Sequence, residues 1–310
     1  MKNQTQITEF ILVGFKGEPQ SQIALLILFL MMYVITLVGN IGMITVTSTD
    51  SKLHSPIYFF LKNLSFIDIF YSSVITLKAM LSFATGNKTI SYNGCATQMF
   101  FFSLLGTTEA FLLAGMAYDR FIAICNPLLY HVMMSKKTCA HLVAVSYFFG
   151  FLNCSTQTGL TFSLSYCEPG EINQCFCDVP AVMKASCSDT FLNEIVLPVL
   201  CGSIVIITST IVLISYGYIV ATVLRIASQE GRSKVFSTCT SHIIAVSLFF
   251  GTAFFMYGQP GAISSPNQGK VVYVFYTIVI PMLNSLIYSL RNKEVKDALR
   301  RQLKRMTFIH

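Results

Sequence analysis

The sequence predicts an all-α membrane protein, a seven-transmembrane helix bundle with a short amphipathic helix after span seven. Two observations lead to this prediction. Hydrophobic residues make up 54% of the 310 residues and charged residues only 11%, and the mean hydropathy is +0.63. A soluble domain carries roughly 25% charged residues because its surface must be wetted. In addition, the chain contains seven apolar runs, each near the roughly 20 residues that cross a hydrocarbon core.

The predicted spans cover residues 23–46, 57–83, 98–118, 142–164, 195–223, 235–257 and 271–290. The segment before the first span contains Glu9 and Glu18 and has no compact basic region, which argues against a cleaved signal peptide. We therefore expect an extracellular N-terminal segment (1–22), a transmembrane domain (23–291) with a long second extracellular loop at about 165–194, and a cytoplasmic C-terminal tail (292–310).

Charge predicts the orientation in the membrane. In this arrangement 15 of the 21 Lys and Arg residues lie on the side that holds the C-terminal tail. Positive charge gathers on the cytoplasmic side of membrane proteins, so the protein is expected in the plasma membrane with its N-terminus outside. The basic balance thus indicates orientation, and no nucleic-acid partner is expected. The sequons at Asn3 and Asn87 then lie outside and are candidate glycosylation sites.

Cysteines gather in the predicted second extracellular loop. It carries Cys167, Cys175, Cys177 and Cys187, and Cys95 lies at the outer start of the third span. An extracellular location permits disulfide bonds. A zinc site is the alternative, but the Cys175–Cys177 spacing is one residue short of the usual pair and the loop has no histidine. Five outer cysteines leave one unpaired.

Several motifs follow one another along nearly the whole chain. They are GN at 39–40, PIYFFL at 56–61, MAYDRFIAICNPLLY at 116–130, KVFSTCTSH at 234–242 and PMLNSLIYSLRN at 281–292. In this order they closely resemble the signatures of odorant (olfactory) receptors, which belong to the rhodopsin-like G-protein-coupled receptors. Two positions depart from the family pattern. Phe121 replaces the tyrosine usual after Asp-Arg, and Ser285 replaces the proline usual after Asn284.

The resemblance implies a receptor that binds a small odorant within the bundle and activates a stimulatory heterotrimeric G protein, which raises cAMP. It also implies the disulfides Cys95–Cys177 and Cys167–Cys187, which leave Cys175 free. The G-protein switch would comprise Asp119, Arg120, Tyr216 and Tyr288. Interfacial snorkelling of Arg120 and anchoring by the two tyrosines are the alternatives for these residues.

Helical spacing indicates candidate ligand-binding faces. The residues are Ser103, Gly106, Thr107 and Ala110 in span three, Leu197, Cys201 and Ile204 in span five, Phe250, Ala253 and Tyr257 in span six, and Thr277 in span seven. Residues three and four apart share a helix face. Plain helix packing is the alternative, because small residues are common where membrane helices meet. These stripes carry no charge, which favours a small, neutral and mostly apolar ligand.

Two acidic residues fall inside predicted spans. Asp68 and Glu109 are costly to place in a membrane and are therefore expected to be functional. We expect them to meet, either around a sodium ion acting as an allosteric ligand, or with Glu109 neutral and merely packing. A cation-coupled transporter that uses these two residues is the alternative function. No other cofactor and no enzymatic activity are expected, because the sequence has no nucleophile elbow, metal-ligand cluster or phosphate-binding glycine loop.

Overall fold

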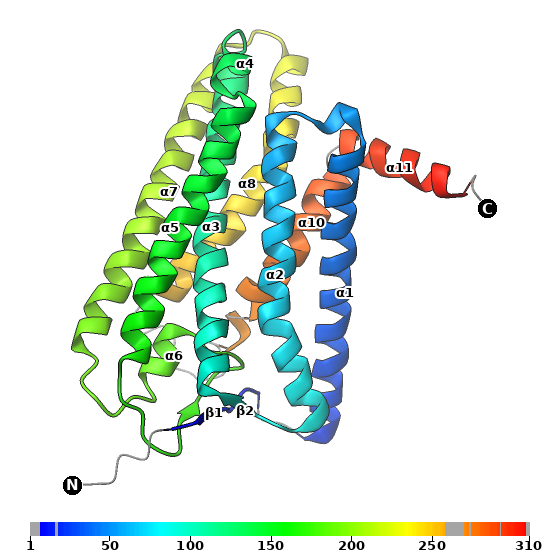
Figure 1. Ribbon diagram of the computed structural model, residues 1–310. Helices are drawn as coiled ribbons and strands as arrows, with labels where there is room; N and C mark the ends of the chain where they lie inside the picture. Colours follow the sequence, from blue (N-terminus) through cyan, green and yellow to red (C-terminus); the bar gives the residue numbers. More distant parts are fainter. Residues whose placement is uncertain (1–6, 16–17, 258–269, 273, 292, 308–310) are drawn as a thin grey trace.

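The computed structural model describes residues 7–15, 18–257, 270–272, 274–291 and 293–307. Figure 1 shows long helices running side by side, with short strands, including β1 and β2, at one end of the bundle and helix α11 leaving the other end. We call these the strand-bearing end and the tail-bearing end. Within the described residues, seven helices are long and apolar enough to cross a membrane, which confirms the predicted fold class.

The long helices are α1 (Pro19–Thr49), α2 (Pro56–Thr85), α3 (Tyr92–Cys125), α5 (Lys136–Phe162), α7 (Phe191–Arg225) and α8 (Gln229–Tyr257). The seventh span, Lys270–Ser289, contains η2 (Phe275–Val279) and most of α10 (Ile280–Arg291). The shorter helices are η1 (Ser51–Leu53), α4 (Tyr130–Met133), α6 (Val179–Met183) and α11 (Lys293–Thr307), and the strands are β1 (Glu9–Leu12), β2 (Thr89–Ser91) and β3 (Glu171–Ile172).

Most spans extend a few residues beyond their predicted ends because polar caps lie outside the apolar runs. The Ser91 hydroxyl accepts a hydrogen bond from the Gly94 amide at 3.1 Å, so α3 begins at Tyr92. Ser135 caps α5 in the same way through Thr138 at 3.2 Å. A side-chain oxygen before the first turn satisfies an amide that has no partner within the helix.

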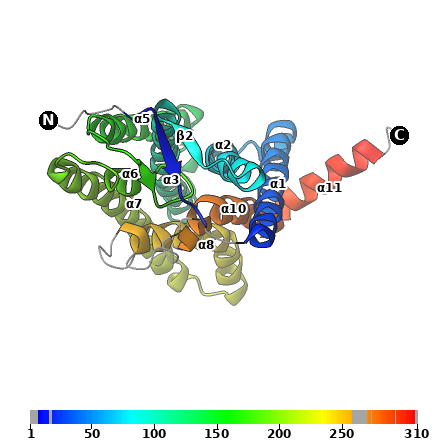
Figure 2. The same cartoon turned by 90° about the horizontal axis from the view of Figure 1, so that it is seen from below.

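A three-stranded sheet was not predicted. Strand β1 lies between β2, to which it is antiparallel, and β3, to which it is parallel. The Phe10 side chain is fully buried, and its ring lies 5.8 Å from that of Tyr92 and 5.1 Å from that of Tyr166. Strand β1 and the residues next to it are therefore packed across the strand-bearing end (Figure 2).

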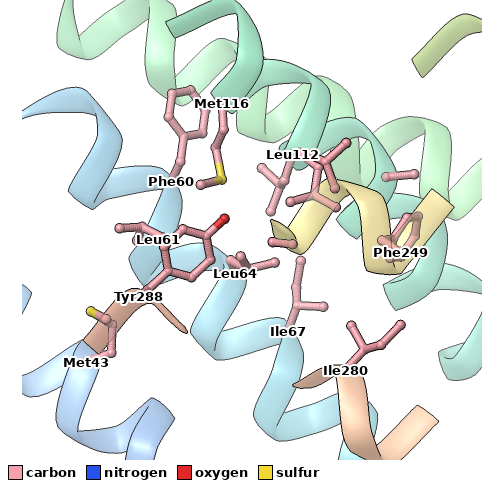
Figure 3. Close-up of a cluster of buried hydrophobic side chains, with 14 of the residues drawn as sticks. Met43, Phe60, Leu61, Leu64, Ile67, Leu112, Met116, Phe249, Ile280 and Tyr288 are labelled. Carbon is pink, nitrogen blue, oxygen red and sulfur yellow. The ribbon is translucent and has the colours of Figure 1, made fainter. Parts of the chain in front are cut away.

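Helix α3 has the largest buried share of the seven spans, and α7 and α1 have the smallest. The exposed side chains of α1 and α7 include Val38 and Leu213. Apolar side chains of this kind suit a lipid-facing surface. The inner cluster is built from several spans, and Figure 3 shows Leu61 and Leu64, Leu112 and Met116, and Tyr288 gathered within it.

Helices α1 and α10 approach each other closely at Gly39. A Cβ atom at this position would lie 2.5 Å from the Ser285 hydroxyl oxygen, so only glycine fits. The Asn40 amide donates to the Pro281 carbonyl at 3.5 Å beside this contact. Pro281 has no amide hydrogen to donate within the helix, and the π-helical turn η2 lies directly before it. Ser285 stands where the family usually has proline, and its side chain forms part of the contact between α10 and α1 at Gly39.

Candidate functional site

Two disulfide bonds hold the connection between α5 and α7 over the strand-bearing end. They join Cys95 to Cys177 and Cys167 to Cys187, the pairs that the family resemblance implies. Cys175 is a buried free thiol. Burial raises the pKa of this thiol to about 11, so it is protonated at neutral pH. The Cys177 amide also donates to Gln98 Oε1 of α3 at 2.9 Å. The loop is thus held against α3 by a covalent bond and a hydrogen bond.

A cavity of about 70 Å³ lies beneath this loop, among α2, α3, α5, α7, α8 and η2. We call it the ligand cavity. It is lined by Tyr71, Phe102, Ser103, Gly106, Thr107, Ala110, Asn153, Gln157, Asp178, Leu197, Cys201, Ile204, Val205, Phe249, Ala253 and Tyr276. All the candidate residues of spans three and five are brought together here, and so is Ala253.

Phe250 and Thr277 do not line the cavity, and the residues that precede them, Phe249 and Tyr276, do so instead. In span six, Ala253 therefore lines the cavity, whereas Phe250 does not. Each residue turns the helix by about 100°, and Phe249 rather than Phe250 shares the face of Ala253. Tyr257 was also a candidate, and its side chain lies outside the described residues.

Sequence reasoning missed the polar side of the ligand cavity. Asn153 Nδ2 donates to the Thr107 hydroxyl at 2.8 Å, and Gln157 Nε2 donates to Asn153 Oδ1 at 2.8 Å and to the Cys201 sulfur at 3.2 Å. Asn153 and Gln157 are four residues apart in a membrane span, and polar residues there are a recognised signal of function. That signal could have identified them.

The loop also brings a carboxylate to the ligand cavity, which the absence of charge in the helical stripes did not predict. Asp178 follows the disulfide-bonded Cys177, lines the cavity and is buried. Its Oδ1 atom accepts from the Val179 amide at 2.9 Å, at the start of α6. The helical stripes contain no acidic or basic side chain, but the cavity as a whole includes this acidic one.

Deeper in the bundle, the two predicted intramembrane acids meet through an amide. Asn284 Nδ2 of α10 lies 3.2 Å from Glu109 Oε1 and 3.4 Å from Asp68 Oδ1. All three side chains are buried. One amide group thus binds both carboxyl groups, and no group of three or more metal-ligating side chains of the His, Cys, Asp or Glu type occurs among the described residues.

The tail-bearing end contains an open cleft of about 1290 Å³, which we call the tail-side cleft. Arg120 and Tyr288 line it. Asp119 forms an ion pair with Arg120 at 2.6 Å and accepts from the Tyr130 hydroxyl at 2.9 Å. Burial and the neighbouring Asp119 raise the pKa of Tyr130, so its hydroxyl remains a donor. The Tyr130 hydroxyl thus helps to hold the Asp119 carboxylate in its pair with Arg120.

Tyr216 binds His242, a residue that the motif at 234–242 contains but to which we assigned no role. The Tyr216 hydroxyl lies 2.6 Å from His242 Nδ1, and His242 Nε2 lies 3.1 Å from the Leu113 carbonyl. A carbonyl only accepts hydrogen bonds, so Nε2 carries the hydrogen and Nδ1 accepts from Tyr216. This chain of contacts joins α7, α8 and α3 beside the tail-side cleft.

Helix α11 is attached to the bundle by a side chain of α2 and by one from the residue between α1 and η1. Tyr58 donates to Glu294 at 2.6 Å, and Arg301 forms an ion pair with Asp50 at 2.5 Å. The Arg301 hydrogen bond lowers the pKa of Asp50. The short amphipathic helix predicted after span seven is therefore fixed at the tail-bearing end of the seventh span.

Seven helices long and apolar enough to span a membrane, a disulfide-tethered loop over an internal cavity and an Asp-Arg pair at the opposite end are the features of a membrane protein of the rhodopsin fold. Squid rhodopsin has the same fold, with a TM-score of 0.71, 17% identity, and coverage of 94% of this chain and 88% of that chain.

Residues 29–306 match the family described as "Olfactory receptor". The chain is 55% identical to human olfactory receptor OR9H1, over 99% of this chain and 100% of the relative. It is 57% identical to mouse olfactory receptor 9S13, over 94% of this chain and 88% of the relative. The chain therefore belongs to the olfactory receptor family of G-protein-coupled receptors, which are signalling receptors and not enzymes.

Proposed function

We propose that this olfactory receptor binds small, neutral and mostly apolar volatile molecules in the ligand cavity, and that it then activates a stimulatory heterotrimeric G protein, which raises cAMP. The observation that best supports this proposal is the ligand cavity. It is small, it lies among the spans, and aromatic and aliphatic side chains make up most of its wall. Such a wall favours ligands held mainly by apolar contact.

A cavity-filling substitution tests the proposed binding site. Ala253 lines the ligand cavity, whereas Gly251 in the same helix is exposed and faces open space. A chemically diverse panel of volatiles would first identify an agonist. Ala253→Leu is then expected to abolish or strongly reduce the response, while Gly251→Leu preserves it at equal surface expression. Equal responses from the two variants would contradict the proposed site.

The proposed G-protein site is the tail-side cleft. Arg120 lies on its wall, together with residues of α2, α8 and α10. The volume of about 1290 Å³ is large enough to admit a segment of another protein. We propose that Arg120 leaves Asp119 and contacts the G protein when α8 moves outward. Arg120→Ala should then remove the cAMP response while agonist binding persists.

We also propose that the strand-bearing end is extracellular and the tail-bearing end cytoplasmic, in the plasma membrane. The basic residues of the tail and the sequons support this orientation. Asn87 is exposed at the strand-bearing end, and the Thr89 amide and hydroxyl both donate to its side-chain oxygen. Asn3 lies outside the described residues. Loss of a glycan from Asn87→Gln, detected by gel mobility after endoglycosidase treatment, would support this orientation, and an unchanged glycosylation pattern would contradict the assignment of Asn87.

Sodium is the proposed allosteric ligand at Asp68 and Glu109. Two carboxyl groups that share Asn284 are close enough to share a cation as well. Sodium that binds the inactive state preferentially should weaken the agonist response. Raising sodium at constant ionic strength should therefore right-shift the response, and Glu109→Gln should remove that shift. A shift that persists in Glu109→Gln would exclude this residue as a ligand.

The family relationship decides between the receptor and the transporter that Asp68 and Glu109 alone would also allow. Relatives at 55% and 57% identity are named olfactory receptors. An agonist response that requires added G protein fits the receptor. A substrate current without any G protein would fit the transporter.

A further inference from the structure

The hydrogen bonds in the wall of the ligand cavity form a directed chain. Gln157 donates to Asn153 at 2.8 Å, and Asn153 donates to Thr107 at 2.8 Å. Gln157 uses the same amino group to donate to Cys201. The three residues of the chain are all buried, and all line the cavity. Because the side-chain oxygen of Asn153 accepts from Gln157, its amino group is the part of the side chain that donates to Thr107.

A second small cavity supports this direction. Gln157 lines it together with Thr161 and Asn193, and its volume is about 10 Å³. That is room for roughly one water molecule. The Thr161 hydroxyl is buried and has no hydrogen-bond partner among the described residues, so it can donate to the carbonyl oxygen of Gln157 through such a water. The amino group of Gln157 is then left facing Asn153 and Cys201.

Thr107 ends the chain. A hydroxyl has one hydrogen to donate, and the Thr107 oxygen already accepts from Asn153. Its hydrogen is therefore available to a molecule in the ligand cavity. A donor that is polarised by the bonds behind it is stronger than an isolated one. A ligand without an acceptor would leave this donor unpaired, which lowers affinity.

We propose that the ligand carries a carbonyl oxygen, as in a ketone, an aldehyde or an ester, and that this oxygen accepts a hydrogen bond from Thr107. The ligand class is set by the relay Gln157–Asn153–Thr107 rather than by Thr107 alone. Asn153 and Gln157 are therefore specificity-determining residues. This inference rests on the proposed function, since it concerns the ligand that the receptor senses in this cavity.

The test compares two probes of the same carbon skeleton, a ketone and the hydrocarbon in which a methylidene group replaces the carbonyl. The wild-type receptor should respond to ketones at concentrations lower by about tenfold or more than to the matched hydrocarbons. Thr107→Val should remove this preference and leave the hydrocarbon response in place. Asn153→Leu should reduce the preference, because Thr107 can then turn its hydrogen away from the ligand.

Thr108→Val is the matched control. Thr108 is the next residue of α3, donates its hydroxyl hydrogen to the Leu104 carbonyl and does not line the cavity, so its substitution should preserve the ketone preference. A preference that survives in both Thr107→Val and Asn153→Leu overturns the relay, as does a wild-type receptor that responds equally to the two probes. A receptor that reaches the surface and responds to no volatile at all contradicts the proposed function, and this inference with it.

Discussion

Two cysteines near the strand-bearing end, Cys95 and Cys175, are expected to have different roles. The Cys95–Cys177 bond closes a loop of 82 residues, and a bond that closes a loop of this length stabilises the fold by about 4.5 kcal/mol in the chain-entropy account of disulfides. We expect Cys95→Ser to abolish surface expression or the ligand response. Cys175→Ser, which removes a buried free thiol, should preserve both. Surface labelling and a dose–response curve measure the two effects, and a normal response from Cys95→Ser would contradict the role of the bond.

Two adjacent phenylalanines provide a second test at the scale of residues. Phe249 lines the ligand cavity and is buried, whereas Phe250 is partly buried and does not line it. Phe249→Ala should therefore shift agonist potency by about tenfold or more, given the apolar contact that is lost. Phe250→Ala should cause a smaller shift. Agonist dose–response curves at matched surface expression measure both, and a larger effect from Phe250→Ala would show that the ligand binds elsewhere.

Sequence reasoning found the candidate residues in spans three and five because the i, i+3, i+4 rule places them on one face. In span six it identified Ala253 but chose Phe250 instead of Phe249, and in span seven it chose Thr277 instead of Tyr276. Phenylalanine occurs at both 249 and 250, so hydrophobicity alone does not fix the phase. Asp178 could not be predicted, because a loop residue reaches the cavity only through the fold of the loop.

At the scale of elements, the contact between α1 and α10 depends on a glycine. A Cβ atom on Gly39 would overlap Ser285, whereas one on Gly217 of α7 would meet nothing within 4 Å. Gly39→Ala should lower stability by about 1–3 kcal/mol, the usual cost of overpacking. Gly217→Ala should be neutral or mildly stabilising, since alanine favours helix. The melting temperatures of the purified variants measure the difference. Equal melting temperatures for Gly39→Ala and Gly217→Ala would contradict the close contact between α1 and α10.

The attachment of α11 to the bundle should depend on the negative charge of Asp50, which pairs with Arg301. The Arg301 hydrogen bond lowers the pKa of Asp50. A carboxyl group with a lowered folded-state pKa stabilises the fold above its unfolded pKa, and this contribution is lost as pH falls through the folded value. Acidification below the usual range of aspartate should therefore release α11, and so should Asp50→Asn at neutral pH.

Hydrogen–deuterium exchange within α11 measures this release. Asp297→Asn is the control, because Asp297 pairs only with Arg300 of the same helix, at 4.0 Å, among the described ion pairs. Faster exchange in Asp50→Asn than in Asp297→Asn is the expected result. Equal exchange in the two variants would show that the Asp50–Arg301 pair does not hold the helix.

Hydropathy predicted the seven spans because crossing a membrane requires a long apolar segment in each of them. The strands were not predicted. Strand β1 has four residues, and its partners β2 and β3 lie far along the chain. A short strand with distant partners leaves almost no local periodicity to detect.

At the scale of the whole molecule, the ligand cavity and the tail-side cleft share α3 and α8. Thr107 and Ala253 line the first, and Arg120 and His242 line the second. A ligand that binds one arrangement of these helices more tightly than another shifts the population toward it. Ligand binding at the cavity can in this way change the shape of the cleft, and this coupling is what the proposed function requires.

The most direct measurement is ligand-evoked cAMP in cells that lack the stimulatory G-protein α subunit, with and without its restoration. We expect a volatile agonist to raise cAMP only when the subunit is restored and only when Arg120 is intact. Ala253→Leu should also remove the response at equal surface expression. An agonist response that persists without the G protein, or the absence of any response to a broad volatile panel from a receptor at the cell surface, would contradict the account.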